Sequence, residues 1–412
     1  MNTANTRFRK PFKLLNRIQH YDWGTKNEDA FIPRFTGIPA VPDRPYAELW
    51  IGAHPGASSE VIVDGEVTPL KRVIDEAPLE ILGEQVARRF GNRLPFLLKI
   101  LSAGRALSIQ AHPDRVQARR LHASDPAHYP DDNHKPEIAI ALDSLTAIAG
   151  FRPVDEIADA VRRYPELQEI AGADPVRRVL AGEGEIATGA AAKELYAAIM
   201  RRADDAAVLS SVIGRIIDRL PAAAARSEEE RIFVEQHAVY GADVGLLSIF
   251  FFNLVHLKPR QAIFTEAGVP HAYIRGNIVE CMANSDNVVR AGLTGKFKDV
   301  PSLLDILQYR FAPYPILNRE AKMDGVVYRT AAEEFEIRGY RKSAGFDERL
   351  SAGGKPVVVL VTLGALDVRW DEGGSGTTKA FRKGDAFLVP AALPAWRMSA
   401  GDEVEFYTVS VP

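Results

Sequence analysis

Three short segments of the sequence place polar side chains where strands are normally apolar. In the first segment Ser108, Gln110 and His112 alternate with Ile109 and Ala111. Side chains two apart in a strand point to the same face, so the hydroxyl, the amide and the imidazole share one face. Such a face makes a poor core and a good ligand set, although a solvent-facing strand surface fits the same pattern.

The other two segments contain Glu137 and His271. Glu137 stands at the mouth of the apolar run 138–142, where an unpaired charge is costly unless a cation lies nearby. His271 ends a Gly-x-Pro-His turn that starts at Gly268, and such a turn can aim an imidazole inward at the start of a strand. A solvated strand edge for Glu137 and an ordinary core or surface position for His271 are the structural alternatives.

Together the three segments supply two imidazoles, one carboxylate and one amide oxygen. Nitrogen and oxygen ligands without a thiolate suit zinc or a neighbouring divalent ion. A single carboxylate leaves the bound ion with net positive charge, so the ion would act as a Lewis acid on a substrate oxygen. These residue types predict a divalent metal site without fixing the metal, and its ligands are Gln110, His112, Glu137 and His271.

Composition excludes several classes of function. The chain has 412 residues and a formal net charge of -3, so no global field favours nucleic acid or an anionic membrane. An anionic substrate must therefore meet a local cationic pocket. The single cysteine, Cys281, fits a reducing compartment. The basic start runs into Pro11 without an apolar segment, and no run is long and apolar enough to span a bilayer. We expect a cytoplasmic protein.

The pattern of apolar runs and turn residues along the sequence indicates the strands and helices that position these residues. Residues 1–152 hold short apolar runs between glycines and prolines, and strand texture returns over 254–273, as in a β-rich domain. Between them, apolar residues recur every three or four positions, which predicts helices. We expect a catalytic domain formed by 1–152 and 241–325, a helical insertion at 153–240, and a smaller β-domain at 326–412.

An internal echo relates the two β-domains. Segments 258–271 and 382–395 share the order turn, buried strand, turn and proline at a constant offset. Two copies of this unit favour related β-barrels of jelly-roll type. In the second copy Ala395 takes the place of His271, and residues 326–412 contain no histidine. The C-terminal domain should therefore keep the fold without the metal site.

That domain is expected to brace the catalytic one. Its large aromatic residues, Phe387 and Trp396, lie among apolar neighbours in the sequence. We expect both to pack in the interior rather than to stack on a sugar.

The order and spacing of these segments resemble type I mannose-6-phosphate isomerases over nearly the whole chain. The resemblance begins at Gln19-His20-Tyr21-Asp22-Trp23-Gly24 and continues through 46–55, 107–113 and 134–137. Its most specific part is the long polar run Glu280-Cys281-Met282-Ala283-Asn284-Ser285-Asp286-Asn287-Val288-Val289-Arg290-Ala291-Gly292-Leu293-Thr294. The resemblance implies a mainly β fold with an α insertion, made of two cupin-like jelly-roll barrels and a helical domain.

The same resemblance assigns roles to individual residues. It implies that Arg290 is catalytic and that one zinc ion per chain is held by Gln110, His112, Glu137 and His271. Two positions depart from the family pattern. Arg260 stands in a turn where relatives usually have glycine, and Gly295 stands where many have proline. Neither position is a ligand.

Aldose–ketose isomerisation moves a proton between adjacent carbons through an enediol. It needs a base, a proton donor to oxygen and stabilisation of developing negative charge. Glu280 and Asp286 are the candidate bases, with Glu280 favoured, and the alternative is that they brace the Arg290 loop. Lys135 and His134 precede Glu137 and can assist ring opening or proton exchange.

The phosphate of the substrate needs cations and hydrogen-bond donors. We expect Lys99, Ser108 and Lys296 to supply them. The predicted reaction interconverts D-mannose 6-phosphate and D-fructose 6-phosphate, carried out by a monomer with no nucleic-acid or membrane partner. Two alternatives stay open: another cupin-type metal-dependent sugar isomerase or epimerase, and a non-catalytic sugar-phosphate-binding protein.

Overall fold

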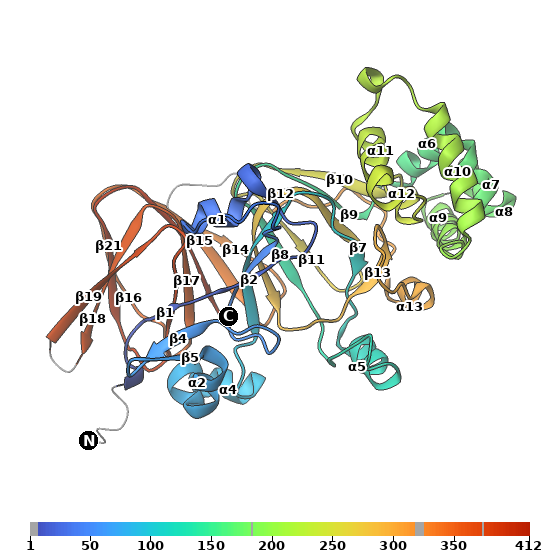
Figure 1. Cartoon of the computed structure of the whole chain (residues 1–412). Helices are drawn as coiled ribbons and strands as arrows, with labels where there is room; N and C mark the ends of the chain where they lie inside the picture. Colours follow the sequence, from blue (N-terminus) through green and yellow to red (C-terminus); the bar gives the residue numbers. More distant parts are fainter. Residues whose placement is uncertain (1–6, 183, 318–324, 373–374) are drawn as a thin grey trace.

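One group of helices gathers at one end of the molecule, and β-sheets with shorter helices beside them make up the rest (Figure 1). The computed structural model describes residues 7–182, 184–317, 325–372 and 375–412, so 318–324 of the expected catalytic domain lie outside it. Helices α6 to α11 lie at the upper right of the figure, and the C-terminal strands lie at the left. Within these described ranges, none of the helices has the length and apolar character needed to cross a membrane.

The central sheet is built around one long strand, β12 (His271–Ala283). β12 pairs antiparallel with β6 (Phe96–Ala103), β8 (Glu137–Ala141) and β9 (Leu145–Phe151), which are buried at every position. Burial on both faces explains why these strands read as continuous apolar runs. The remaining strands of the sheet are β2 (Arg17–Gln19), β3 (Glu48–Ile51), β7 (Ile109–Ala111), β10 (Phe252–Leu257), β11 (Ala262–Thr265) and β13 (Val289–Gly292).

β12 is longer than the sequence texture indicated. Strand character was expected to end near Tyr273, yet the strand runs on to Ala283. Its second half includes Glu280, a charged residue on a buried strand, and this residue hides the apolar pattern. The strand is nevertheless held at every position from Gly276 to Ala283 by pairing with β6.

Several short helices accompany the strands of the central sheet. α5 (Arg115–Ser124) starts directly after the segment of His112, because Asp114 forms a capping box with Gln117 at its first turn. The others are α1 (Phe31–Thr36), α2 (Leu70–Glu76), α3 (Pro78–Leu82), α4 (Glu84–Phe90), α12 (Gly245–Ser248), α13 (Val300–Ile306) and the 3-10 turn Asn27–Asp29. A separate hairpin joins β4 (Glu60–Val63) to β5 (Glu66–Pro69).

The segment between β9 and β10 is helical. Apolar periodicity gives α10 (Ala206–Arg219) a buried stripe of Leu209, Val212, Ile213 and Ile216. The helix ends before Pro221, and a 3-10 turn, Ala223–Ala225, follows. Besides α12, the other helices of this segment are α6 (Val154–Arg163), α7 (Pro165–Ala171), α8 (Ala173–Ala181), α9 (Glu185–Met200) and α11 (Glu228–Tyr240).

Two sheets form the C-terminal β region. The larger has the order β1-β20-β17-β22-β15-β14 and the smaller has the order β16-β21-β18-β19. Their bounds are β1 (Phe12–Leu14), β14 (Val326–Tyr328), β15 (Glu336–Lys342), β16 (Phe346–Leu350), β17 (Val357–Leu363), β18 (Ala365–Glu372), β19 (Ser375–Arg382), β20 (Ala386–Val389), β21 (Trp396–Ala400) and β22 (Val404–Ser410). Phe387 and Trp396 are buried in the apolar cluster of this region, which confirms their expected packing role.

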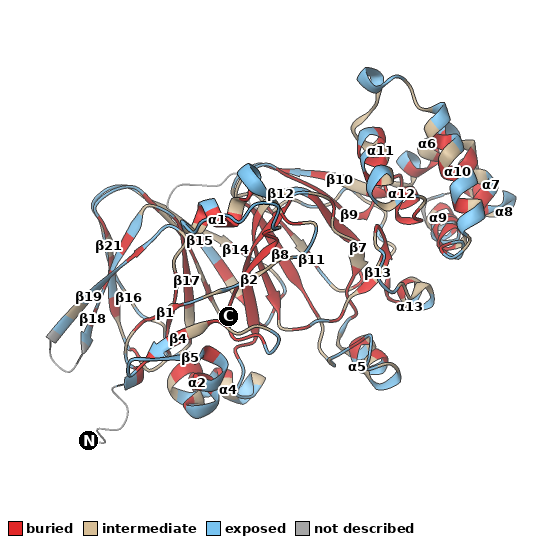
Figure 2. Ribbon diagram, viewed as in Figure 1, coloured by how far each residue is buried: buried red, intermediate tan, exposed pale blue. Residues whose placement is uncertain are grey.

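The two β regions share a core. One apolar cluster joins Ile100 and Ile138 of the central sheet to Phe335, Val358 and Leu388 of the C-terminal strands. Figure 2 shows the strands of the central sheet largely buried, whereas the outer C-terminal strands β16 and β19 and the outer faces of the helices are exposed. The C-terminal strands are therefore packed against the sheet that carries the polar segments.

Candidate active site

Strand pairing brings the polar segments side by side. Gln110 in β7 lies opposite His271 in β12 and, on its other side, opposite Arg290 in β13. Residues directly opposite in antiparallel strands point to the same face. The amide, the imidazole and the guanidinium therefore form one row across three strands.

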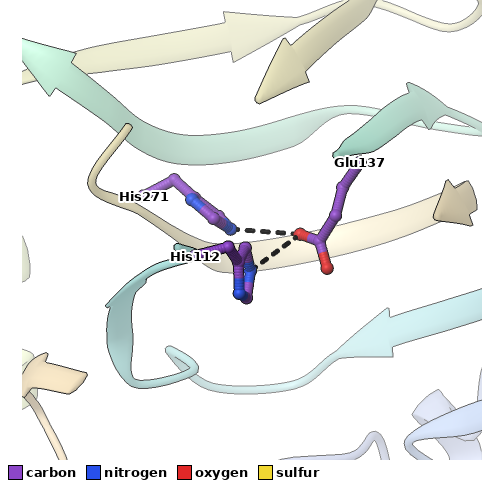
Figure 3. A group of neighbouring side chains, drawn as sticks. All are labelled: His112, Glu137 and His271. Atoms are coloured by element: carbon purple, nitrogen blue, oxygen red, sulfur yellow. Dashed lines mark hydrogen bonds and ion pairs between the residues drawn. The ribbon is translucent and has the colours of Figure 1, made fainter. Parts of the chain in front are cut away.

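His112, Glu137 and His271 form a buried cluster, and their ligand atoms all lie within 4.8 Å of one another. The Nε2 atoms of His112 and His271 lie 3.4 and 3.2 Å from the Glu137 Oε2 atom. Figure 3 shows both rings facing the carboxylate from separate segments. The structure thus brings together three of the four residues expected to bind a metal, and Gln110 is the strand neighbour of one of them.

The hydrogen bonds of the two rings fix their tautomers. Nδ1 of His112 lies 2.8 Å from the carbonyl oxygen of Asn287, and Nδ1 of His271 lies 3.0 Å from that of Val269. A carbonyl oxygen only accepts, so each Nδ1 carries the hydrogen and each Nε2 keeps its lone pair. Two lone pairs then face a carboxylate, and Nε2 of His112 is buried without a hydrogen-bond partner.

This donor set fits a divalent cation. Burial lowers the pKa of His112 to about 4, so the ring is neutral, the form that binds metals. Burial alone would raise the pKa of Glu137, but its interactions with His112 and Lys135 hold it well below the usual range. Lys135 Nζ lies 3.3 Å from Glu137 Oε1. A cation between the three groups would remove the repulsion between their lone pairs.

The turn before His271 requires unusual backbone geometry. Gly268 has a φ of 76°, and a Cβ there would lie 2.4 Å from the carbonyl oxygen of Ile306. Its N–H donates to the carbonyl oxygen of His112 at 2.7 Å, which ties the two ligand segments together. In the preceding turn, Arg260 has a φ of 71°, a conformation that favours glycine.

A buried charge network lies beside the cluster. Glu280 is opposite Lys99 in the β12–β6 register, and Lys99 Nζ lies 3.1 Å from Glu280 Oε2 and 3.5 Å from Glu48 Oε2. Burial raises the pKa of Glu280, and the opposing charge of Lys99 only partly offsets this. Lys99 is itself 5% exposed and held between two carboxylates, so its charge is already neutralised.

The loop that leads to Arg290 is fastened by Asp131. Its carboxylate accepts from the Ser285 hydroxyl, the Asn287 side-chain amide and the Asp286 backbone N–H at 2.8, 3.1 and 2.7 Å. Asn287 in turn accepts from His112. Asp131 therefore controls both the loop and the orientation of a histidine in the cluster.

Arg290 is half-buried in this loop. Within the described ranges, no carboxylate lies at ion-pair distance from its guanidinium, and burial lowers its pKa. Asp286 is exposed, 3.5 Å from Nε2 of His54. Ser108 is half-buried just before β7, and Lys296 is exposed over the ring of Tyr21. Asp286 and Lys296 thus lie in the solvent-facing part of the site, apart from the buried cluster.

Sequence reasoning missed several residues of this region. Glu48 and His54 both lie in the run 46–55 that resembles the family, but the sequence alone gave neither residue a role. His54 is buried, packs against Trp50, and faces Asp286. The sequence does carry one signal for Asp131: it is the first residue of the polar and charged run 131–135, which contains the candidate residues His134 and Lys135.

Comparisons with known proteins agree on one family. The phosphomannose isomerase type I catalytic-domain family matches residues 11–154. The mannose-6-phosphate isomerase of Ogataea parapolymorpha is 36% identical and covers 92% of this chain and 93% of its own length. The mannose-6-phosphate isomerase of Mus musculus is 40% identical and covers 75% of both.

Solved structures give the same result. A crystal structure of a variant of phosphomannose isomerase from Salmonella typhimurium has a TM-score of 0.84 at 26% identity. It covers 97% of this chain and 99% of that one. A crystal structure of mannose 6-phosphate isomerase bound with zinc and yttrium has a TM-score of 0.83, also at 26% identity.

Proposed function

This chain belongs to the type I mannose-6-phosphate isomerase family and is an aldose–ketose isomerase, and from that premise we propose how its residues interconvert D-mannose 6-phosphate and D-fructose 6-phosphate. The observation that carries the proposal is the convergence of two tautomer-fixed imidazoles on Glu137, with Glu280 further along β12, the strand of His271, and Arg290 on β13. The reaction proceeds through an enediol. The proton leaves C2 of the open-chain aldose and is delivered to C1.

Glu280 is the base that moves this proton. A carboxylate works best as an acid–base group near neutral pH when its pKa is raised, and burial has that effect on Glu280. Its 3.1 Å contact with Lys99 fixes the carboxylate in place. We assign Lys99 to this positioning role, because a lysine already neutralised by two carboxylates has little charge left for the phosphate expected from the sequence.

Arg290 stabilises the negative charge that develops on the enediolate oxygens. Its guanidinium is permanently charged and has no carboxylate partner among the described residues. Lys135 and His134 exchange protons with the sugar oxygens during ring opening. Asp286, exposed beside His54, is the second carboxylate at the entrance. Ser108 and Lys296 are our candidates for the phosphate, as a hydroxyl donor and an exposed cation.

We propose that one zinc ion per chain is held by Gln110, His112, Glu137 and His271. Nitrogen and oxygen donors without a thiolate support zinc, and one carboxylate leaves a positive ion. When bound, the ion polarises the sugar oxygens and stabilises negative charge on them. The four side chains hold and orient it, and burial of the cluster keeps water from the carboxylate.

Three further features belong to this proposal. The two β regions are jelly-roll barrels of cupin type, supported by β11 and β20 occupying equivalent places in the internal echo. The chain divides into a catalytic domain (1–152 and 241–325), a helical insertion (153–240) and a C-terminal domain (326–412). It acts as a cytoplasmic monomer on a small sugar phosphate, without nucleic-acid or membrane partners.

The test is a coupled assay of the full chain. With mannose 6-phosphate as substrate we expect fructose 6-phosphate to form, activity to stop after chelation, and zinc to restore it. In heavy water, solvent deuterium at C1 of the product would support the enediol route, since the proton on the base can exchange with solvent before it is delivered. Activity in a verified metal-free sample would contradict the metal, and no fructose 6-phosphate from mannose 6-phosphate would contradict the function. Glucose 6-phosphate and other sugar phosphates serve as substrate controls.

A further inference from the structure

A buried carboxylate reaches the candidate active site from the C-terminal β region. Glu334 precedes β15 and is 2% exposed. In the described part of residues 326–412, Glu334 and Thr362 are the only buried polar or charged residues. A buried carboxylate is costly unless it is paired, so its partners indicate what holds it there.

Those partners belong to the catalytic region. Nε2 of His134 lies 2.8 Å from Glu334 Oε1, and Nη2 of Arg115 lies 2.5 Å from the same oxygen. Arg115 starts helix α5, directly after the His112 segment. The carboxylate thus joins a residue beside the metal cluster to the helix that follows one of its ligands.

The segment that carries Glu334 is firmly anchored. Phe335 and Ala332, on either side of it, are buried in the apolar cluster shared by the two β regions. The other oxygen of Glu334 accepts from the backbone N–H of Glu333 at 3.1 Å. Both oxygens are therefore fixed, and the carboxylate presents a set direction to the imidazole.

His134 is held from the opposite side as well. Its neighbour Asn133 donates to the carbonyl oxygen of Asn284 and accepts from Asn287, both in the loop that leads to Arg290. Its other neighbour, Lys135, contacts Glu137. The segment is clamped between the Arg290 loop and Glu334, and the His134 side chain remains 20% exposed.

We propose that Glu334 is a positioning residue of the isomerase, which holds the His134 imidazole in one tautomer and orientation through their hydrogen bond. This inference rests on the proposed function, in which His134 exchanges a proton with the sugar. An ionised carboxylate only accepts, so Nε2 carries the hydrogen and Nδ1 of the neutral ring keeps its lone pair. That lone pair is the group able to take a proton from a sugar hydroxyl.

Arg115 supports this arrangement by keeping the carboxylate ionised. Charge-assisted hydrogen bonds are stronger than neutral ones, and Glu334 makes two of them. A protonated Glu334 would offer a hydrogen instead and would allow the opposite tautomer of His134. The C-terminal β region therefore contributes to the chemistry through one side chain, without touching the substrate.

The chain offers a matched control. Glu333 is next in sequence, is 54% exposed, and lies 3.6 Å from the same arginine and 3.0 Å from Arg89. Glu333→Gln removes a charge from the same place without affecting His134. Glu334→Gln keeps the size of the side chain, and Glu334→Asp keeps its charge.

The first measurement is nitrogen NMR of the metal-loaded protein with labelled histidine. The His134 signals are assigned by their loss in His134→Ala. We expect the Nε2–H tautomer in the wild type, in Glu333→Gln and in Glu334→Asp, and a mixture of tautomers in Glu334→Gln. An unchanged tautomer in Glu334→Gln would overturn the proposal. This measurement does not depend on which reaction the protein catalyses.

The second measurement is a double-mutant cycle on kcat/KM for mannose 6-phosphate. Glu334→Gln should lower kcat/KM roughly 10- to 100-fold, the range of a hydrogen bond to a charged group. The melting temperature should match that of Glu333→Gln. In the His134→Ala background the same change should have an effect of less than about twofold, because coupled residues are not additive. The same loss in both backgrounds would overturn the proposal, whereas a wild type without isomerase activity would instead refute the proposed function.

Discussion

The two β regions carry the same strand unit with opposite interiors. Next to β11, the central sheet encloses His112, Glu137 and His271 and, beside them, Lys99 and Glu280, all buried. Around β20, the buried cluster is made of apolar side chains such as Val359, Phe381, Phe387, Trp396 and Phe406. The central sheet buries charged groups beside β11, whereas the interior around β20 is apolar.

This difference assigns the two interiors different roles: the charged interior of the central sheet serves the reaction, and the apolar interior around β20 serves stability. Each buried charge in the central sheet loses hydration and must be compensated by a partner. An apolar interior has no such cost, and each buried aromatic ring adds stability. The shared core then lets the apolar region support the charged one. Substitutions should therefore affect activity in one region and stability in the other.

The largest effect is expected from His112→Ala in the charged interior. The variant should lose the metal and, on the order of a thousandfold or more, its activity, since a bound cation contributes several kcal/mol to charge stabilisation. Metal content per chain and the coupled assay measure both. His256→Ala, an exposed histidine paired with Glu228, is the control and should retain both. A metal-loaded His112→Ala protein would show that the cluster does not depend on this ligand.

The next effect concerns Arg290. Arg290→Ala should lower kcat roughly 100- to 1,000-fold, as for the loss of a group that stabilises developing charge. Metal content should stay at the wild-type level, because Arg290 is a strand neighbour of Gln110 and not a member of the cluster. Arg290→Lys should recover little, since an ammonium lacks the planar fork of donors. A rise in KM alone would make Arg290 a binding residue.

In the apolar interior the expectation is reversed. Phe387→Ala removes a fully buried ring stacked on Phe381, and should cost about 3–5 kcal/mol of unfolding free energy. Metal content and kcat of the folded fraction should stay unchanged. Urea unfolding followed by the assay below the transition tests both. A large loss of kcat in folded protein would mean that the two regions are not separable in this way.

The smallest expected effect is a pH dependence of the stability that Glu334 contributes at the contact between the two β regions. Burial by itself would raise the pKa of Glu334, but its bonds to His134 and Arg115 outweigh burial and lower it. A lowered folded-state pKa adds stability above the ordinary range of a glutamate, and this stability is lost as the pH falls through the lowered value. Wild type should exceed Glu334→Gln by about 1–2 kcal/mol at neutral pH, and the gap should shrink in acid.

Urea unfolding of the wild type, Glu334→Gln and Glu333→Gln across this range measures the gap. Glu333→Gln should follow the wild type at every pH, because its side chain is exposed. A gap that widened on acidification would reverse the sign and contradict the lowered pKa.

The structure brings together His112, Glu137 and His271, which the sequence grouped as expected ligands, and this grouping has a physical reason. Alternation within one strand puts Gln110 and His112 on one face, and a local turn aims His271, so short-range rules were sufficient. The apolar packing of Phe387 and Trp396 followed from composition in the same way. These features depend on neighbours within a few residues.

Features that depend on distant partners were not predictable. Lys99 reads as a free cation until its pairing with Glu280 and Glu48 is known. Asp131 acts through Asn287, and Glu334 acts through His134, each across more than a hundred residues of chain. The continuation of β12 past Tyr273 was hidden because its buried carboxylate resembles a loop residue. Strand register determines the pairing of Lys99 with Glu280, and the packing of distant loops determines the contacts of Asp131 and Glu334. A single sequence reveals neither.

The pairing of β1 with β20 has a consequence for biosynthesis. Phe12, Lys13 and Leu14 complete the larger C-terminal sheet, but the ribosome makes them long before Ala386–Val389. At about 5–20 residues per second, β1 waits on the order of tens of seconds for its partner. During that time the edge of β1 that later pairs with β20 is open. Lys13, which forms an ion pair with Asp385 in the folded protein, carries a charge there that discourages association with other nascent chains. Closure of this sheet therefore waits until Ala386–Val389 have been made, and a ribosome stalled before Ala386 should hold a chain whose first strand is still accessible to proteases.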